Sequence, residues 1–282
     1  MRIALLALIA GIIGIPAVSA ADVLITACGA VVPPRAAATL AADLDCSGEP
    51  SSQPAVVLGH RATLSLAGFS LTAAVNGIGV RCTDGCAVSG PGSITSAPAG
   101  PGDARAACIR ALRDVGDQPR PQRVTIEKLD LQGCGEGFQG DTDKRGARLT
   151  ASGVTADGNG VGFVAASIRA RDTSASGNDG NGFYAPSGGV KAVNVHADGN
   201  GVDGVTAARL ILKDSTASGN GLFGVRALAG SARLVRATVT GNALRDVASA
   251  GAPHLSASTC TTSAVWLPPN GFGAPWGVCS AD

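Results

Sequence analysis

Apolar and small residues return in short alternating blocks about every 21 residues between positions 124 and 247. The positions ten, eight, five and three before a recurring asparagine are mostly apolar or small, as in Leu149, Ala151, Val154 and Ala156. Alternation with a period of two predicts strands, and the slip of one residue between the two pairs predicts a bend. A further apolar residue, four or five positions after the asparagine, begins a third strand. Each block therefore predicts three short strands and three bends.

The recurring asparagine follows a glycine in five successive copies: Asn159, Asn178, Asn200, Asn220 and Asn242. A sixth, degenerate copy upstream has Cys134 in the asparagine position. A leucine-rich repeat also has this period and an asparagine, but no helical segment follows here, and the nine-residue period of the calcium-binding β-roll is absent. The pattern predicts an all-β fold, a single-stranded right-handed parallel β-helix of three-strand coils, with about 8–9 coils.

The asparagines have a structural interpretation in such a coil. Coils stack about 4.8 Å apart, so equivalent side chains lie directly above one another. A file of stacked asparagines satisfies its buried amides from coil to coil. The preceding glycine supplies a backbone conformation that a Cβ resists. We therefore expect a structural asparagine ladder.

The repeat turns, of the type "VTADGNGVGF", resemble those of the right-handed parallel β-helices of the pectin-lyase-like superfold. The segments "GHRATLSLAGFSLTA" (59–73) and "WGVC" (276–279) resemble parts of the secreted bacterial β-helix repeat proteins within it. The resemblance implies the fold. It does not imply one activity, because the superfold includes lyases, hydrolases, epimerases and proteins without catalysis.

The chain divides into four segments. Residues 1–20 have an arginine, an apolar run and a small-x-small ending, which predict a signal peptide and a secreted or periplasmic protein. Residues 21–61 are predicted to cap the first coil, 62–253 to form the β-helix and 254–282 to cap the last coil. No later apolar run is long enough to span a bilayer, so we expect no membrane partner. The protein is expected to be a monomer.

Eight cysteines follow the predicted signal peptide, and an even number in an oxidising compartment predicts disulfides. Spacing favours Cys28–Cys46, Cys82–Cys86, Cys108–Cys134 and Cys260–Cys279. For the middle four, pairing 82 with 108 and 86 with 134 fits the spacing as well. Zinc is disfavoured, because "CTDGC" has no second ligand pair at a suitable spacing, and no metal site is predicted.

Charge argues against nucleic acid as a partner. The chain has 22 Lys+Arg and 21 Asp+Glu, and the predicted signal peptide contains Arg2, which leaves 21 of each. No basic run and no aromatic-rich basic patch occurs.

Candidate chemistry follows from the resemblance, which implies an active face on the outer side of the first strand, walled by the loops after the third strand. The weak catalytic candidates there are Glu127, Arg169, Arg171 and Lys191, and the loop residues that could bind a ligand are Arg113, Asp114, Arg120 and Lys144. Asp172 and Asp214, two coils apart, are spaced like the carboxylates of an inverting glycosidase. No cofactor is predicted, although Asp141 and Asp143 could bind calcium if the protein were a lyase.

Motifs typical of the enzymes are missing. Neither the "NTD", "DD", "GHG" and "RIK" set of polygalacturonase-like hydrolases nor the "DPHE" of alginate epimerases occurs. The leading hypothesis is a secreted β-helix that binds an extended polysaccharide on its lateral face without catalysis. The alternatives are a polysaccharide lyase or glycoside hydrolase, and a structural envelope protein.

Overall fold

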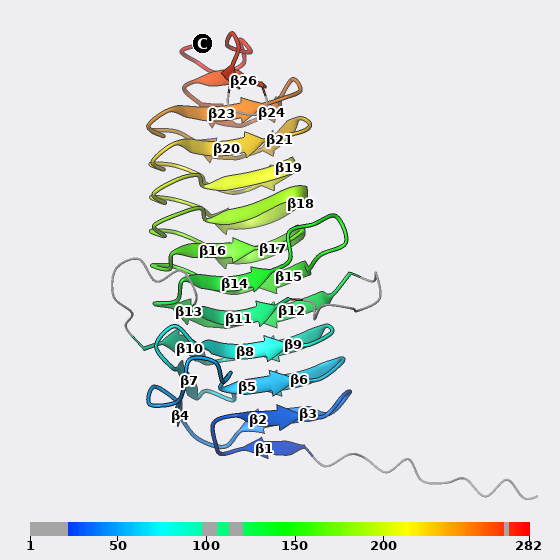
Figure 1. The fold of residues 1–282 in the computed structure, drawn as a ribbon. Coiled ribbons are helices and arrows are strands. Elements are labelled where there is room, and N and C mark those ends of the chain that lie inside the picture. The colour runs from blue at the N-terminus through cyan, green and yellow to red at the C-terminus, as the bar shows by residue number, and fades with distance from the viewer. Residues whose placement is uncertain (1–21, 98–105, 113–120, 268–270) are drawn as a thin grey trace, which may run out of the picture.

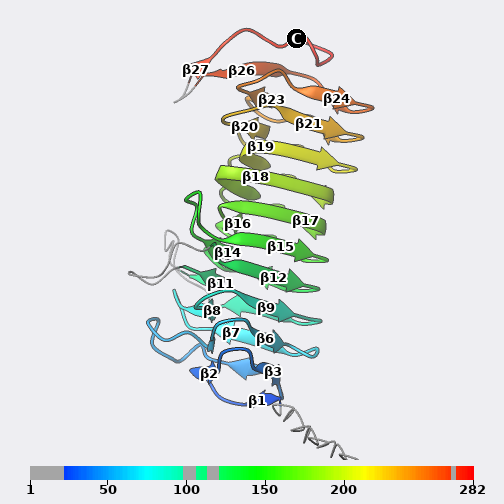
Figure 2. The same cartoon turned by 90° about the vertical axis from the view of Figure 1, so that its right-hand side faces the viewer.

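Short strands separated by tight bends wind the chain into a right-handed parallel β-helix, as predicted (Figures 1 and 2). It has about ten coils, more than the 8–9 expected from the sequence. The computed structural model describes residues 22–97, 106–112, 121–267 and 271–282. The strands form three lateral faces, which we call the first-strand, second-strand and third-strand faces after their order in each coil.

The first-strand face contains β1 (Val23–Ile25), β3 (Ala37–Leu40), β6 (Ala62–Ser65), β9 (Cys86–Ser89), β12 (Arg123–Glu127), β15 (Arg148–Ser152), β17 (Ser167–Ser174), the later parts of β18 (Phe183–His196) and β19 (Val205–Lys213), β21 (Ala232–Val235) and β24 (His254–Ser256). Every neighbouring pair is parallel.

The second-strand face has short strands of two to four residues. It contains β4 (Leu44–Asp45), β7 (Ser70–Ala73), β10 (Ser93–Ser96), β13 (Asp130–Gln132), β22 (Thr238–Val239) and β25 (Thr259–Cys260). Between β13 and β22 it continues through bridges at Thr155, Ser174, His196 and Thr216.

The third-strand face contains β2 (Ala30–Val32), β5 (Val56–Leu58), β8 (Ile78–Cys82), β11 (Ala107–Ala111), β14 (Glu136–Gly140), β16 (Val161–Val164), the first parts of β18 and β19, β20 (Phe223–Ala227), β23 (Arg245–Ser249) and β26 (Ser263–Leu267). The short strand β27 (Gly271–Phe272) pairs antiparallel with β26.

The register is the one that the repeat predicts. Val80 pairs with Ile109 and Ile109 with Phe138, so each of these two steps of 29 residues, longer than the later repeats, adds one coil. Phe163 and Phe183 continue this buried row with their rings stacked at 5.1 Å. Because the interior of a narrow coil is filled by such stacked rows, insertions are accommodated only at the bends.

The asparagines lie in one vertical file between the second and third strands. Oδ1 of Asn178, Asn200, Asn220 and Asn242 each accepts a hydrogen bond from the backbone N–H of the preceding asparagine, at 2.9–3.1 Å. Each glycine before an asparagine has a positive φ, for example 64° at Gly199. The asparagines therefore hold consecutive coils together and have no free polar group for catalysis.

The bend between the first and second strands also needs a left-handed residue. Its positions in successive coils are Lys128, Gly153, Asp172, Asn194, Asp214 and Arg236, with φ between 49° and 63°. Asn, Asp and Gly tolerate this conformation best, so the recurrence of Asp and Asn in this row has a conformational cause.

The coils extend beyond residues 62–253, the predicted limits of the β-helix. β1 to β5 already stack beneath β6 and β8, and β24 to β26 stack above β21 to β23. The sequence did not reveal these coils, because their strands are short and their bends follow no recurring pattern. No helix among the described residues is long and apolar enough to cross a membrane.

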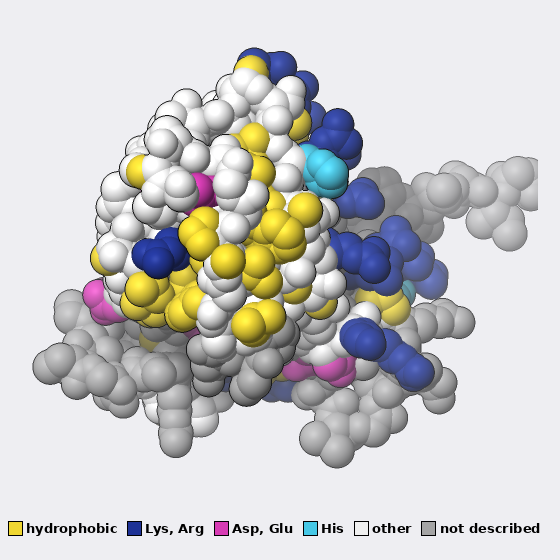
Figure 3. All heavy atoms as spheres, turned by 90° about the horizontal axis from the view of Figure 1, so that it is seen from above, with side chains coloured by type: hydrophobic (Ala, Val, Ile, Leu, Met, Phe, Trp, Pro, Cys, Tyr) yellow, Lys and Arg dark blue, Asp and Glu magenta, His cyan; other side chains and the backbone are white. Residues whose placement is uncertain are grey.

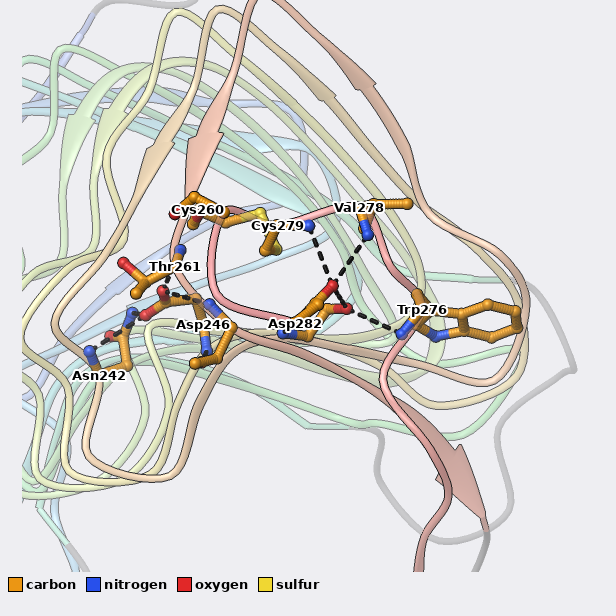
Figure 4. Close-up of a disulfide and its surroundings, with 11 residues drawn as sticks. Asn242, Asp246, Cys260, Thr261, Trp276, Val278, Cys279 and Asp282 are labelled. Atoms are coloured by element: carbon orange, nitrogen blue, oxygen red, sulfur yellow. Dashed lines mark hydrogen bonds between the residues drawn. A yellow bond between two sulfur atoms is a disulfide. The ribbon is translucent and has the colours of Figure 1, made fainter.

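Four disulfides fasten the chain: Cys28–Cys46, Cys82–Cys86, Cys108–Cys134 and Cys260–Cys279. The structure therefore has the first of the two pairings considered for the middle four cysteines. Cys134, which occupies the asparagine position, joins the coil of β14 to that of β11. Figure 4 shows the last disulfide, which ties residues 276–282 over the final coil.

Candidate functional site

A groove rich in basic side chains runs along the first-strand face, where each third strand bends into the next first strand. Its floor is made by outward-facing residues in two rows, separated by one inward-facing residue. One row has Arg123, Arg148, Ser167, Gly189, Arg209 and Ser231, and the other has Thr125, Thr150, Arg169, Lys191, Ile211, Arg233 and His254. The alternation of the strands places both rows outside, while their neighbours fill the core.

Two adjoining cavities occupy this groove. The first, of about 430 Å³, is lined by four basic residues, Arg123, Lys144, Arg148 and Arg169, together with Thr125, Thr150 and Ser167. The second, of about 630 Å³, includes Arg169, Lys191, Arg209, Arg233 and His254. Because Ser167 and Arg169 line both, the cavities form one continuous groove from β12 to β24.

Every coil from β12 to β24 contributes a basic residue to the groove: Arg123, Arg148, Arg169, Lys191, Arg209, Arg233 and His254 in that order. All seven are exposed. Seen along the axis, the Lys and Arg side chains gather on the right, the side on which β12, β15 and β21 lie in Figure 1 (Figure 3). The result is a ladder of positive charge at the coil spacing of about 4.8 Å.

These cations have no carboxylate partners within the described part of the chain. The ion pairs found there belong to other residues, such as Arg226 with Asp203 and Arg236 with Asp214. No aspartate or glutamate lines either cavity. A concave surface with one sign of charge concentrates ions of the opposite sign, so the groove is suited to an anionic ligand.

The sequence-predicted candidates separate into two groups. Arg169, Lys191 and Lys144 line the groove. Arg171 and Glu127 lie two residues further along their strands, in a third outward row that lines neither cavity. Asp141 and Asp143 lie in the loop that carries Lys144. Arg113, Asp114 and Arg120 lie outside the described residues.

The geometry does not support Asp172 and Asp214 as a glycosidase pair. Both occupy left-handed bend positions. Asp172 Oδ1 accepts a hydrogen bond from Asn194 at 2.7 Å, and Asp214 accepts two from Arg236, at 2.5 and 2.7 Å. The hydrogen bond from Arg236 lowers the pKa of Asp214, whereas a general acid needs a raised one.

The acids with raised pKa values lie away from the groove, on the third-strand face. Burial raises the pKa of Glu136 to about 7, against the opposing effect of Arg110. Burial also raises the pKa of Asp203. The charge of Arg226, whose guanidinium lies 2.6 Å from Oδ2 of Asp203, opposes this rise. Within the described residues, no three His, Cys, Asp or Glu side chains come together as a metal site would require.

Sequence reasoning missed Arg123, Arg148, Arg209, Arg233 and His254 as parts of a single site. They are 20 or more residues apart, so no window of the sequence shows a basic run. The signal that would have found most of them is the row eleven positions before the repeat asparagine, where arginine recurs at 123, 148 and 209. In such a fold, a charged surface is found by comparing equivalent positions of successive coils, because neighbours on the surface are far apart along the chain.

Comparison with known proteins supports the fold. No family model matches the chain, and no curated protein matches it. Among solved structures it is similar to the A-modules of two mannuronan C-5 epimerases of Azotobacter vinelandii. The AlgE6 module is 16% identical, with a TM-score of 0.51 over 88% of this chain and 71% of that one. The AlgE4 module is 14% identical, with a TM-score of 0.48 over 83% of this chain and 68% of that one. The chain is a parallel β-helix protein.

Proposed function

We propose that the protein binds an extended acidic polysaccharide along the groove of the first-strand face. The observation that carries this proposal is the ladder of seven exposed basic residues, one on each coil from β12 to β24, without carboxylate partners among the described residues. The threonine and serine hydroxyls between them would hydrogen-bond to sugar hydroxyls.

The spacing of the charges favours a sugar polymer over DNA. The coils repeat at about 4.8 Å, close to the length of one pyranose residue in an extended chain. A DNA strand has a phosphate about every 3.4 Å, which is out of step with the coils. An acidic polysaccharide with a carboxylate on each residue, lying parallel to the helix axis, meets one cation per sugar. One structure of the same fold is named for mannuronan, an acidic polysaccharide, although that likeness itself supports only the fold.

The lining of the groove favours binding over catalysis. A lyase or epimerase needs a base at the sugar's C5 proton, and a hydrolase needs a pair of carboxylic acids. The described residues around the two cavities supply arginines, lysines, one histidine and hydroxyls, but no carboxyl group. Lys144, Lys191 and His254 are the groove residues that could supply the base of a lyase mechanism.

The proposal is tested by titrating the protein, without its first 20 residues, with polygalacturonate, alginate and the uncharged polymer dextran. We expect binding to the two acidic polymers alone, with the logarithm of the binding constant falling linearly with the logarithm of the salt concentration. Failure of both acidic polymers to bind at low ionic strength would refute the proposal. Ultraviolet absorbance of an unsaturated product in the same mixtures would instead support the lyase alternative.

A further inference from the structure

The ladder of positive charge continues below the groove, toward the N-terminal end of the helix. In the register of the first-strand face, Arg123 lies above Gly85, Gly85 above Arg61, and Arg61 above Arg35. These positions belong to the coils of β9, β6 and β3, which stack directly beneath β12 (Figure 2). Arg35 and Arg61 are both exposed. Two further cations therefore lie in line with the groove.

The backbone does not require arginine at either position. Arg35 and Arg61 have φ of 61° and 55°, and Gly85 forms the same bend in the coil above with φ of 69°. A left-handed bend favours Gly, Asn or Asp, and a long side chain with a Cβ is strained there. Neither arginine has a carboxylate partner in the part of the chain that the structure describes. Both charges are thus available to a ligand, and neither is explained by the bend.

The coil of β9 is a gap in the ladder. Gly85 has no side chain, and the neighbouring Asp84 is 53% exposed. Oδ2 of Asp84 lies 2.7 Å from Nδ1 of His60, so this carboxylate is held against the bend that precedes β6. Arg61 and Arg123 are two coils apart, about 10 Å, which is close to the screening length of about 8–10 Å at moderate salt. Their fields overlap across the gap, and an extended anionic chain can pass one coil without a cation.

We propose that the acidic chain extends past β12 and uses Arg61 and Arg35 as a second binding segment. This inference rests on the proposed function. The groove from β12 to β24 covers seven coils, and the coils of β3, β6 and β9 bring the total to ten. At one sugar per coil, the groove alone holds about seven sugars and the whole face about ten. The protein thus selects long acidic chains over short oligosaccharides.

The dependence of affinity on chain length tests the second segment. Calorimetry measures the binding of oligogalacturonates of seven and of ten residues to the protein without its first 20 residues. We expect the decamer to bind at least about tenfold more tightly, with a steeper salt dependence, because it neutralises two more charges. A gain of only a few-fold, which the larger number of binding registers supplies by itself, would overturn the second segment and leave the proposed function intact. Absence of binding at both lengths would overturn both.

A double variant tests the assignment to these two arginines. Arg35→Ala combined with Arg61→Ala should bring the decamer within about threefold of the heptamer and change the affinity for the heptamer less than about twofold. Arg171→Ala combined with Lys213→Ala is the control, because it removes two exposed cations of the same face that line neither cavity. The control should leave the ratio of the two affinities as in the wild type. If both double variants lower this ratio equally, only net charge matters and the assignment is refuted. Thermal unfolding verifies that both double variants fold.

Discussion

The file of asparagines ends on a carboxylate: Oδ1 of Asp246 accepts hydrogen bonds from Nδ2 of Asn242 at 2.8 Å and from its backbone N–H at 3.2 Å. The other oxygen of Asp246 accepts from the N–H groups of Thr261 at 2.7 Å and Thr262 at 3.2 Å. Asp246 is 1% exposed. It therefore takes the place of the next asparagine and joins the ladder to the final coil (Figure 4).

Replacement of Asp246 should destabilise this end of the coil strongly. Asp246→Ala removes the buried carboxylate that accepts from four N–H donors, and we expect the free energy of unfolding to fall by about 3 kcal/mol. Asp246→Asn keeps an acceptor for Asn242 but turns an NH₂ group toward Thr261 and Thr262, so its loss should be about half as large. Urea unfolding measures both. Asp130→Ala, an exposed carboxylate on β13, is the control, with an expected change within about 0.5 kcal/mol; an equally mild effect of Asp246→Ala would contradict this role.

The middle of the ladder should be equally sensitive. Oδ1 of Asn200 accepts from the N–H and Nδ2 of Asn178 at 3.1 and 2.9 Å, and its own Nδ2 donates to Asn220 at 3.0 Å. We expect Asn200→Ala to cost about 3 kcal/mol, because donors and an acceptor in a dry interior lose their partners. Asn194→Gly, at an exposed bend with φ of 54°, should cost less than about 1 kcal/mol. If thermal unfolding shows that the two variants lose similar amounts of stability, the buried asparagines stabilise the fold no more than an exposed bend residue does.

The fold could be predicted because one physical repeat determines it. The apolar residue four or five positions after each repeat asparagine is visible in the sequence, and the structure stacks Phe163 and Phe183 in that register. The coils at the two ends escaped prediction, since their short strands and varied bends have no recurring signature. This is why the predicted β-helix stopped short at both ends.

The site could be predicted only in part. Arg169 and Lys191 are adjacent in one row, and the repeat register places them on one face. Arg123 and Arg209 belong to the same groove. Their row becomes visible only when the position eleven residues before the repeat asparagine is compared between coils. Asp172 and Asp214 recur for the sake of bend conformation. Recurrence on a solenoid surface therefore indicates a site only where the backbone does not itself require that residue type.

Stability should depend on pH through Glu136. Burial raises its pKa from 4.5 to about 7, so the folded state holds a proton that the unfolded state has already lost above pH 4.5. The stabilisation is complete below pH 4.5 and is lost as the pH rises through 7, on the order of 2 kcal/mol. Glu136→Gln should make the free energy of unfolding depend less on pH between pH 5 and pH 8 than in the wild type. Urea unfolding of both proteins at several pH values measures this difference. An unchanged slope in the variant would refute the assignment to Glu136.

The C-terminal segment should depend on the Asp282 carboxylate. It accepts hydrogen bonds from Oγ and the N–H of Ser263 and from the N–H groups of Val278 and Cys279, the last two at 2.8 and 3.0 Å. Desolvation raises the pKa of Asp282, but the hydrogen bonds from these three residues prevail and lower it. Its contribution is thus present above pH 3.8 and lost as the pH falls through the lowered pKa. In Asp282→Asn, amide exchange at Val278 and Cys279 should accelerate about tenfold at neutral pH; unchanged exchange at both would argue against this anchor.

The groove itself is tested most sharply by two arginines of β17. Arg169 lines both cavities, whereas Arg171, two residues along the same strand and also exposed, lines neither. Arg169→Ala should therefore weaken binding of an acidic polysaccharide roughly tenfold, through the loss of a charged contact at the junction of the cavities. Arg171→Ala changes the net charge identically but should cost less than about threefold, because a charge outside the groove acts only through a screened field. Calorimetric titration with polygalacturonate at low and high salt measures both, and thermal unfolding checks that both variants fold. If Arg171→Ala weakens binding as much as Arg169→Ala, the polymer does not follow the groove and lies across the face.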